Sequence, residues 1–343
     1  MRVCFDYDVV KYQVGYASEN RSIQVVHRTT GDELTFANRT EFYGRNKKGG
    51  WLADVNSKRT SPFSLDEFTI QDVQVMKPFK LVEDILNAKI NSVLKHLGTK
   101  DFYGWLGDGK VFRHAEATIL PYKGERATLK PLALARISEM LLTNSRYKGK
   151  LAMDSLEADD HLAMDSWEAF KVWSKTKHTR DRLVVVTVDK DARGCTGHLF
   201  NPDEMKLPLT IQGFGKLYWK DNTASLILSG HGRVWLLAQM LMGDNVDNID
   251  PTHLAGIDGY GPATVFKALQ GCKDDKQALE VVVNTYKQWY PAPVAYTSFN
   301  GNMYTKDWLG VAEEMWMLLR MRRWKDDNLS FKDVLDKVGV NYG

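Results

Sequence analysis

The chain has 343 residues, of which 43% are hydrophobic and 26% charged, and its formal net charge is +3. This length allows a large buried core, arranged as one big domain or two smaller ones. No stretch reaches the roughly 18 consecutive apolar residues that span a bilayer, which excludes an integral membrane protein and predicts no membrane partner. The three cysteines are widely spaced, which argues against a disulfide framework and a paired-thiolate zinc site. With no secretory h-region at the N-terminus, we expect a cytoplasmic protein.

Bases and acids are separated along the chain although the formal charge is nearly balanced. Residues 146–150, 171–180 and 320–327 are basic runs, whereas acids recur as tight pairs. This separation would suit a polyanion bound through metal ions, although solvated helix faces explain the basic runs as well.

The first third of the chain alternates between strand and helix patterns. "RVCFDYD" predicts a short buried strand whose carboxyl end presents Asp6. Residues 20–80 predict an insertion that contains a hairpin, because two strand-like runs flank the turn "TTGDE". Apolar residues at helical spacing predict a helix from Phe79 to a C′ glycine, Gly98.

The middle of the chain repeats the same alternation. A strand over 102–108 ends on Asp108, and an exposed ribbon or loop is expected over about 110–126, followed by a helix at about 131–144. Ser155 or a neighbour is expected to cap a helix whose first turn is acidic, and a strand over 183–188 leads to Asp189. Strands that end on acids and are separated by helices predict an α/β fold. We expect a mainly parallel central sheet flanked by helices, with ligands at the strands' carboxyl ends.

The last part of the chain reads as strands and then helices. Further strands are expected over 198–230, a helix ends near Gly243, and Pro262 opens another. The last third is predicted to be helical, with a buried stripe formed by Trp308, Val311, Met315 and Leu318.

Acidic side chains fall at the ends of these predicted elements. Taken singly, each is explained as an exposed turn or as a favourable charge at a helix N-terminus. Gathered at one sheet edge, they would repel one another unless cations neutralised them. Hard oxygen ligands select Mg²⁺ or Mn²⁺ over Zn²⁺. Two such ions about 4 Å apart would stabilise the attacking and leaving oxygens of a phosphodiester hydrolysis. The acidic clusters are Asp6, Asp108, Glu157/Asp159/Asp160, Asp189/Asp191 and Asp244/Asp247.

Several of these blocks occur together in a known order. "FDYD", "LGDGKVFRHAEATILPYKGER", "LEADD", "TVDKD" and "MGDNVDNI...GYGPATV" resemble, in order, the acidic blocks and the helix-hairpin-helix of the 5′ nuclease superfamily. That superfamily includes flap endonucleases, the 5′ nuclease domain of bacterial DNA polymerase I and the 5′-3′ exonucleases of tailed bacteriophages. The resemblance covers residues 1–8 and 102–270, and "DYDVVKYQ" looks most like the phage exonucleases.

The resemblance implies roles for individual residues. Asp6, Asp108, Glu157, Asp159 and Asp160 would form one metal region, and Asp189, Asp191, Asp244 and Asp247 the other. Lys123 and Arg126 would contact the scissile phosphate, and Tyr122 would stack on a terminal base. The implied further DNA contacts are Arg113, Gly259, Gly261 and Thr264, with a K⁺ ion at the helix-hairpin-helix.

The implied organisation is a PIN-like nuclease core over 1–230 and a helical region over 231–343. The core would hold the insertion at about 20–80 and an arch at about 110–150, and the helix-hairpin-helix would span about 243–270. The chain departs from the family in the long stretch before Asp108, in a long link before Gly259, and in Ala263, where many members carry a lysine.

We therefore expect a Mg²⁺-dependent 5′-3′ exonuclease or flap endonuclease that acts on DNA with 5′ ends, nicks or flaps. RNA in RNA–DNA hybrids is left open as a substrate, and a phage-encoded chain would work in the bacterial host's cytoplasm. One alternative is a structure-specific DNA-binding protein that has lost the chemistry, although every acidic block is retained here. Another is a PIN-type ribonuclease, which would lack the helix-hairpin-helix.

Overall fold

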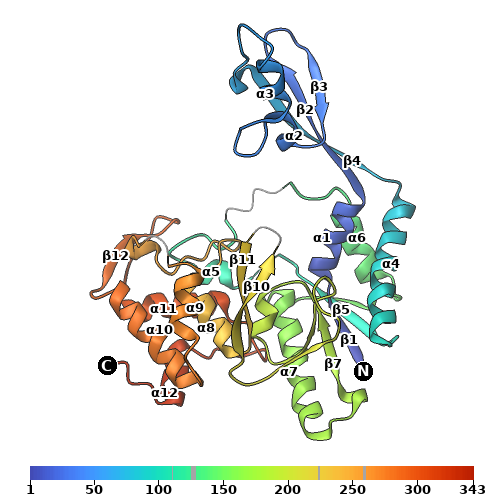
Figure 1. Cartoon of the computed structure of the whole chain (residues 1–343). Helices are drawn as coiled ribbons and strands as arrows, with labels where there is room; N and C mark the ends of the chain where they lie inside the picture. The colour runs from blue at the N-terminus through green and yellow to red at the C-terminus, as the bar shows by residue number, and fades with distance from the viewer. Residues whose placement is uncertain (110, 125–128, 223–224, 258–259) are drawn as a thin grey trace. The chain divides into compact units, whose positions relative to one another are not determined.

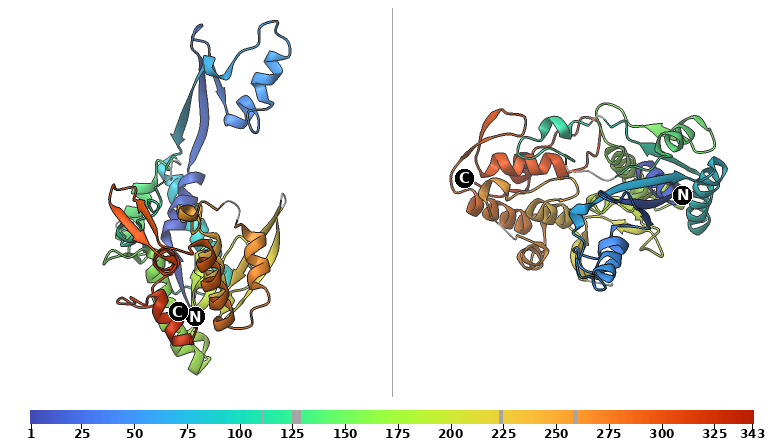
Figure 2. Two further views of the ribbon diagram at one scale, coloured as in Figure 1. Left: turned by 90° about the vertical axis from the view of Figure 1, so that its left-hand side faces the viewer. Right: turned by 90° about the horizontal axis from the view of Figure 1, so that it is seen from above.

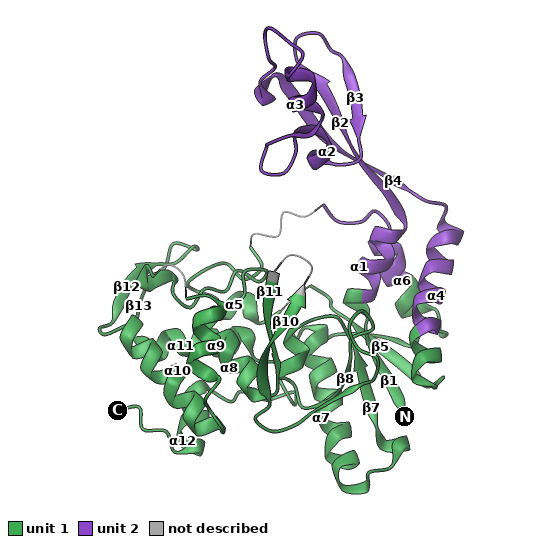
Figure 3. Cartoon of the chain, viewed as in Figure 1, with its two compact units in different colours: residues 1–9, 93–128, 140–343 green, residues 10–92, 129–139 purple. Residues whose placement is uncertain are grey.

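The computed structural model describes residues 1–109, 111–124, 129–222, 225–257 and 260–343. Two compact units divide the chain (Figure 3). Unit 1 comprises residues 1–9, 93–128 and 140–343, and unit 2 comprises residues 10–92 and 129–139. Within the described residues, no helix combines the length and the apolar character needed to cross a membrane.

Unit 1 is built around a six-stranded sheet with the order β6-β5-β1-β7-β8-β9 (Figure 1). Five strands are parallel and β9 runs antiparallel to β8, so the predicted mainly parallel sheet is confirmed. Every residue of β7 is buried, as expected for a parallel strand covered on both faces. The strands are β1 (Arg2–Asp6), β5 (Phe102–Leu106), β6 (Gly149–Leu151), β7 (Leu183–Val186), β8 (Gly197–Phe200) and β9 (Leu209–Ile211).

The register of this sheet decides which residues share its carboxyl edge. Asp6 pairs with Trp105 of β5, and Phe5 pairs with Val186 of β7. The three central strands therefore end at nearly the same level. Helix α7 (Ala158–Thr176) packs against these strands, which carries its N-terminus toward the same edge.

Helices form a second layer of unit 1 around an extended hydrophobic core. The later helices gather in one group in every view (Figures 1 and 2), as the apolar spacing predicts. Val311 and Met315 of the predicted stripe are at most 1% exposed. The helices are α8 (Arg233–Met242), α9 (Pro262–Leu269), α10 (Asp275–Trp289), α11 (Trp308–Leu319) and α12 (Phe331–Val338).

Two hairpins complete unit 1. The strands β10 (Lys216–Asn222) and β11 (Ser225–His231) were expected within 198–230, and this prediction is confirmed. The hairpin of β12 (Val294–Thr297) and β13 (Met303–Lys306) interrupts the last third, which the sequence predicts to be helical. Short 3-10 turns lie at η2 (Thr179–Asp181), η3 (Asp191–Gly194) and η4 (His253–Ala255).

Two local predictions in unit 1 are wrong. Residues 111–124 form no exposed ribbon: they hold the short helix α5 (Arg113–Glu116) and bury Ala117, Ile119 and Tyr122 in the core. Ser155 does not cap α7. Glu157 takes that position, with Asp160 three residues later completing a capping box.

Unit 2 contains a three-stranded antiparallel sheet with the order β3-β2-β4. The predicted hairpin of β2 and β3 is confirmed, and β4 adds a strand that the sequence reading missed. Phe42, Phe68 and four other buried side chains form a small core on this sheet. The strands are β2 (Glu19–His27), β3 (Glu33–Phe36) and β4 (Phe68–Met76), and the short helices are α2 (Arg39–Tyr43), α3 (Gly50–Asn56) and η1 (Leu65–Glu67).

Three longer helices have residues in both units. The helix predicted from Phe79 to Gly98 is confirmed as α4, and Gly98 follows it with a positive φ of 67°. The helix expected at 131–144 is confirmed, though shorter, as α6. Their bounds are α1 (Tyr7–Ala17), α4 (Phe79–Leu97) and α6 (Leu134–Thr143).

Candidate active site

Asp6 is held in a fixed position at the carboxyl edge of the sheet. The Thr187 hydroxyl, just beyond β7, donates a hydrogen bond of 2.7 Å to Asp6 Oδ2. The backbone N–H of Val9 donates to Asp6 Oδ1 at 3.0 Å. Both carboxylate oxygens therefore have a donor, and the side chain joins the end of β1 to the residue after β7.

The "TVDKD" segment that follows β7 forms a turn held by its own side chains. Thr187 Oγ1 accepts from the Asp189 N–H at 3.0 Å, and Asp189 Oδ1 accepts from the Asp191 N–H at 2.8 Å. Gln239 of α8 donates to Asp191 Oδ1. Between them in the chain, Lys190 pairs with Asp244, its Nζ lying 2.9 Å from Asp244 Oδ2. The two aspartates are thus side by side at the edge next to Asp6.

The N-terminus of α7 adds a further acidic side chain to this edge. Asp159 lies in the first turn of α7 and is partly buried. The negative charges of Asp6, Asp189 and Glu157 act on its carboxylate and raise its pKa. We call Asp6, Asp159, Asp189 and Asp191 the edge group. The structure brings these four predicted ligands together from three separate parts of the chain.

The edge group carries more negative charge than its surroundings balance. Burial first, and then repulsion from Asp8 and Asp189, raise the pKa of Asp6 to about 7. Burial also raises the pKa of Asp191 to about 7, with contributions from Asp189 and Asp244. The pKa values of Asp159 and Asp189 rise for the same reasons, burial first and neighbouring carboxylates second. Full ionisation at neutral pH therefore calls for additional positive charge.

A different arrangement surrounds Asp160, the residue next to Asp159. Arg113 NH1 and NH2 donate to Asp160 Oδ2 and Oδ1 at 2.7 and 2.9 Å, and NH1 also reaches Glu157 Oε2 at 3.1 Å. The remaining guanidinium donors bind the carbonyls of Leu318 and Arg320. Burial would raise the pKa of Asp160, but Arg113 outweighs it and holds that pKa below its usual value. We call Arg113, Glu157 and Asp160 the Arg113 group.

This arrangement contradicts two predictions. Arg113 is 0% exposed and its donors are occupied, so it cannot contact DNA as expected. Asp160 is also 0% exposed, and each of its carboxylate oxygens accepts from Arg113. Asp160 therefore neutralises Arg113 and is not available to the predicted metal region.

Lys123 lies between the two groups. Its Nζ is 2.5 Å from Glu157 Oε1 and 3.8 Å from Asp247 Oδ2, and its side chain is 22% exposed. Its backbone has a φ of +56°, and the Lys123 N–H donates to the Asp247 carbonyl at 2.9 Å. Asn248 Nδ2 donates to the Pro121 carbonyl from the same loop. A left-handed conformation at a non-glycine residue persists only where its surroundings impose it. The contacts with the loop of Asp247 therefore fix the backbone of Lys123.

Tyr122 has a structural position instead of the predicted role in base stacking. It is 4% exposed, and its hydroxyl donates to Asp247 Oδ2 at 3.0 Å and lies 3.2 Å from Glu157 Oε2. A ring this deeply buried presents no face to a nucleotide base. The hydroxyl instead positions the two carboxylates that also face Lys123.

The other predicted site residues are placed less tightly. Asp108 follows β5 at the same sheet edge, and its side chain is exposed. Asp244 is 4% exposed and pairs with Lys190. Gly261 is the N-cap of α9, and Thr264 is exposed in the first turn of that helix. Arg126 and Gly259 lie outside the described residues.

Three functional side chains were missed by the sequence reading. Asp8 Oδ2 accepts from the Gly107 N–H at 3.0 Å and raises the pKa of Asp6. Thr187 and Gln239 orient Asp6 and Asp191. Asp8 and Thr187 stand inside the quoted motifs "FDYD" and "TVDKD", so their positions were visible. Gln239 carried no signal, because it is a single polar residue within an apolar helix.

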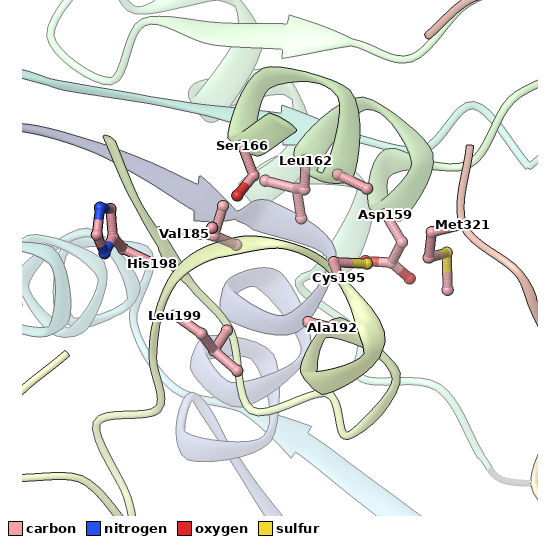
Figure 4. Close-up of a pocket in the computed structure, with 11 residues that line it drawn as sticks. Asp159, Leu162, Ser166, Val185, Ala192, Cys195, His198, Leu199 and Met321 are labelled. Atoms are coloured by element: carbon pink, nitrogen blue, oxygen red, sulfur yellow. The ribbon is translucent and has the colours of Figure 1, made fainter. Parts of the chain in front are cut away.

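A small cavity of about 20 Å³ lies beside Asp159 (Figure 4). Leu162, Val185 and Leu199 supply apolar walls, and Cys195 and Met321 lie near the carboxylate. Burial first, and then repulsion from Asp159, raise the pKa of the Cys195 thiol to about 12, so the thiol stays protonated. Carboxylate oxygens, and not sulfur, are thus the ionic donors of this edge.

The donor chemistry of the edge group fits a hard divalent cation, since it consists of carboxylates that lack balancing charge. In the part of the chain that the structure describes, no three His, Cys, Asp or Glu side chains are already arranged to hold a metal ion.

Comparison with known proteins gives a single kind of match. No family model matches the chain, and no curated protein matches it. Among solved structures, a match is the "Crystal Structure of T5 D15 Protein Co-crystallized with Metal Ions", with 16% sequence identity and a TM-score of 0.41. The match covers 76% of this chain and 91% of that chain.

Proposed function

We propose that the chain is a metal-dependent nuclease that hydrolyses phosphodiesters of DNA from or near 5′ ends. The observation that carries the proposal is the edge group: carboxylates from three parts of the chain meet at the carboxyl edge of a parallel sheet with pKa values raised by burial and mutual repulsion. An edge of this kind binds cations, and Lys123 stands next to it. The resemblance of the sequence motifs to 5′ nucleases supports the same reaction.

Two Mg²⁺ ions, for which Mn²⁺ can substitute, would be held chiefly by the edge group. Asp6 and Asp159 would serve one ion, and Asp189 and Asp191 the other, with Asp108, Asp244 and Asp247 contributing directly or through water. When bound, such ions activate water and neutralise the charge that develops on the phosphodiester. The hydrogen bonds from Thr187 to Asp6 and from Gln239 to Asp191 would keep these two carboxylates oriented toward the ions.

Lys123 would supply a fixed positive charge to the scissile phosphate. In the unliganded chain its ammonium pairs with Glu157, and a substrate phosphate would compete for it. Because the Lys123 backbone is tied to the Asp247 carbonyl, the charge is already in position before substrate arrives. Preorganised charge of this kind stabilises the transition state more than it stabilises the ground state. Arg126, outside the described residues, would act beside it.

The proposed substrates are duplex DNA with 5′ ends, nicks or flaps, and RNA in RNA–DNA hybrids as a further class. A helix-hairpin-helix over 243–270 would hold the duplex. An arch for a single strand, expected over about 110–150, would exclude Ala117, Ile119 and Tyr122, which are buried in the core. The N-terminus of α9, with Gly261 as N-cap and Thr264 exposed, would bind a backbone phosphate, with K⁺ nearby and Gly259 alongside. Residues 1–230 would be the nuclease core and 231–343 the helical duplex-binding region.

The test is cleavage of 5′-labelled blunt, nicked and flapped duplexes in Mg²⁺, with product sizing. We expect cleavage near the 5′ end by the wild-type chain and its loss in an Asp189→Ala/Asp191→Ala variant. Asp101→Asn is the matched control, because this exposed aspartate precedes β5 at the opposite edge of the sheet. Undiminished cleavage by the double alanine variant would remove the edge group from the reaction.

A structure-specific DNA-binding protein without chemistry is the second candidate. This candidate predicts duplex binding without cleavage in either Mg²⁺ or Mn²⁺. The same cleavage assay, run beside a binding assay, separates the two candidates.

A further inference from the structure

A group of basic side chains in unit 2 has no part in the site described above. Arg45, Lys47 and Lys48 lie in the loop between α2 and α3, and Lys58 and Arg59 follow α3. All five are exposed, and we call them the basic cluster. Residues 45–59 contain these five bases against a single acid, Asp54. The segment is therefore strongly cationic although the chain as a whole is nearly balanced.

These charges are not neutralised by neighbouring acids. Arg39, just before the cluster, forms an ion pair of 2.5 Å with Asp72. By contrast, across the described ranges of the chain no ion pair involves Arg45, Lys47, Lys48 or Lys58. Arg59 is oriented by its own segment, since its guanidinium stacks on Phe63 at 3.7 Å and its Nε donates to the Ser61 carbonyl. The cluster thus presents its charge to solvent.

The loop that carries three of these bases has a specified backbone conformation. Gly44 has a φ of 78°, and a Cβ built there would lie 2.0 Å from the Lys48 carbonyl oxygen. Gly50 has a φ of 71°, and its Cβ would lie 2.6 Å from the Gly44 nitrogen. Only glycine fits such close approaches. The side chains of Lys47 and Lys48 therefore project from a tightly closed turn.

Aromatic packing anchors this turn to the sheet of unit 2. Phe42, at the end of α2, is 0% exposed, and its ring stacks on Trp51 of α3 at 5.9 Å. The same ring meets Phe68 of β4 edge-on at 5.3 Å. Contacts of this kind fix both helices that flank the loop. The charges are consequently held on a rigid support, which lowers the entropic cost of binding a fixed partner.

The surroundings of the cluster favour a polyanion over a protein partner. Protein interfaces are centred on apolar and aromatic anchors and are depleted in lysine. No exposed large hydrophobic side chain lies in described residues 39–64; those of unit 2 occur elsewhere, at Tyr16, Leu34, Val75, Met76, Leu81, Leu129 and Leu132. Nucleic-acid backbones, in contrast, are bound by arginine and lysine contacts to phosphates.

The spacing of the bases also suits a phosphate backbone. Helix α3 has 7 residues, so it separates the loop at its N-terminus from Lys58 and Arg59 by about 10 Å. Duplex DNA carries one charge per about 1.7 Å of axis, so this span covers roughly six phosphates. The distance between the two ends of the cluster is therefore within the length of a single duplex site.

We propose that the basic cluster of unit 2 is a second nucleic-acid contact, which binds the phosphate backbone independently of base sequence and takes no part in cleavage. The choice of nucleic acid as the polyanion rests on the proposed nuclease function. The cluster raises the affinity for duplex and the salt dependence of binding. It leaves the chemical step at the edge group unchanged.

The test uses the full chain with an Arg45→Gln/Lys47→Gln/Lys48→Gln variant. Binding to a blunt duplex is titrated at several salt concentrations, with Ca²⁺ in place of Mg²⁺ to prevent cleavage. Each lost phosphate contact should reduce the log–log salt slope by about 0.9 and the affinity near 0.1 M salt by up to about tenfold. The single variant Lys58→Gln should lose about one such contact. Single-turnover cleavage at saturating protein should stay at the wild-type rate.

The matched control is Lys171→Gln/Lys175→Gln/Arg180→Gln, which removes three exposed charges near and just beyond the C-terminal end of α7, far from Glu157 at its N-terminus. It should bind duplex as the wild-type chain does. Unchanged thermal midpoints would show that all variants fold.

Wild-type affinity and slope in the triple glutamine variant would overturn the inference, even if the chain cleaves DNA. Tighter binding of the wild-type chain to vesicles that contain phosphatidylserine than to duplex would overturn it too. Conversely, weakened binding in this variant, together with a wild-type chain that cleaves nothing in Mg²⁺ or Mn²⁺, would support the inference and overturn the proposed function.

Discussion

Asp159 and Asp160 are adjacent in the chain, yet the structure gives them opposite electrostatic environments. The pKa of Asp159 is raised well above its usual value by burial and by Asp6 and Asp189. The pKa of Asp160 is lowered, because Arg113 outweighs the effect of its burial. Successive residues of a helix point in directions about 100° apart, so one faces the sheet edge and the other faces α5. Two neighbouring acids thus serve different purposes.

The edge group and the Arg113 group extend this contrast. The Arg113 group is complete by itself: its guanidinium donors reach Asp160, Glu157 and two backbone carbonyls. The edge group holds one buried and three half-buried carboxylates whose mutual repulsion is left unbalanced. A complete ion-pair network stabilises the fold, whereas an incomplete one stores electrostatic free energy that a bound cation can release.

The largest expected effect is a loss of folding stability in the variant Arg113→Met. Removal of the guanidinium leaves Asp160 buried without a counter-ion and leaves Glu157 with Lys123 as its cation. The free energy of unfolding should therefore fall by about 3–5 kcal/mol. Urea denaturation followed by circular dichroism measures the loss. The double variant Arg113→Met/Asp160→Leu is the control and should recover much of it. A loss below about 1 kcal/mol for the single variant would contradict the assigned role.

The next effect concerns Lys123, which links the two groups. Lys123→Ala should reduce single-turnover cleavage by about a hundredfold or more, as when a preorganised charge stabiliser is lost. Duplex affinity measured in Ca²⁺ should change far less. Lys100→Ala is the control, since this exposed lysine lies just before β5 at the opposite sheet edge. A wild-type rate in the Lys123 variant would leave this lysine without a catalytic role.

A third prediction separates the groups by pH. Asp6 and Asp191 have folded-state pKa values of about 7, above their unfolded values, so the folded chain binds extra protons between about pH 4 and 7. In EDTA, stability should therefore fall by about 1–2 kcal/mol as pH rises from 6 to 8. The pKa of Asp160 is lowered, so its stabilisation should be lost only in strong acid.

Divalent metal should reverse this loss, because cations replace the missing protons at the edge group. Mg²⁺ added at pH 8 should raise the thermal midpoint, and the same addition at pH 6 should raise it less. Thermal melts at both pH values measure the difference. Equal shifts at pH 6 and pH 8 would mean that Mg²⁺ stabilises the chain at another place.

The smallest expected effect is a gain in stability. Asp191→Asn removes one half-buried charge from the edge group and keeps an oxygen that can accept from Gln239. In EDTA at pH 8 it should raise the free energy of unfolding by about 1 kcal/mol. Asp160→Asn should have the opposite sign, because it leaves Arg113 without its counter-ion. If both asparagine variants destabilise equally, the two groups do not differ as described.

The local sequence was sufficient for much of the fold. Runs of β-formers that end on acids predicted β1, β5 and β7, and apolar periodicity predicted α4, α8 and α11. The resulting alternation predicted a mainly parallel sheet, which is confirmed. From that topology alone, Asp6 and Asp189 were expected at one edge, because the carboxyl ends of parallel strands meet there.

The segment over 111–124 shows where sequence patterns were insufficient. Its mixture of polar and apolar residues resembles an exposed ribbon, but Ala117, Ile119 and Tyr122 are buried in the helical core of unit 1. Burial there depends on α8, α10 and α11, which lie more than a hundred residues away in the chain. Short-range periodicity cannot report a contact with so distant a partner.

The sequence by itself determined which residue types were available at the sheet edge, since each acid directly follows a strand or opens a helix. Only the tertiary structure decided which acids are balanced. Arg113 enters the core 47 residues before Asp160 and takes both of its oxygens, while Asp159 turns toward Asp6 and Asp189. The physical reason is that the pKa of a carboxyl group depends on charge within a few ångströms in space, and chain distance carries no information about it.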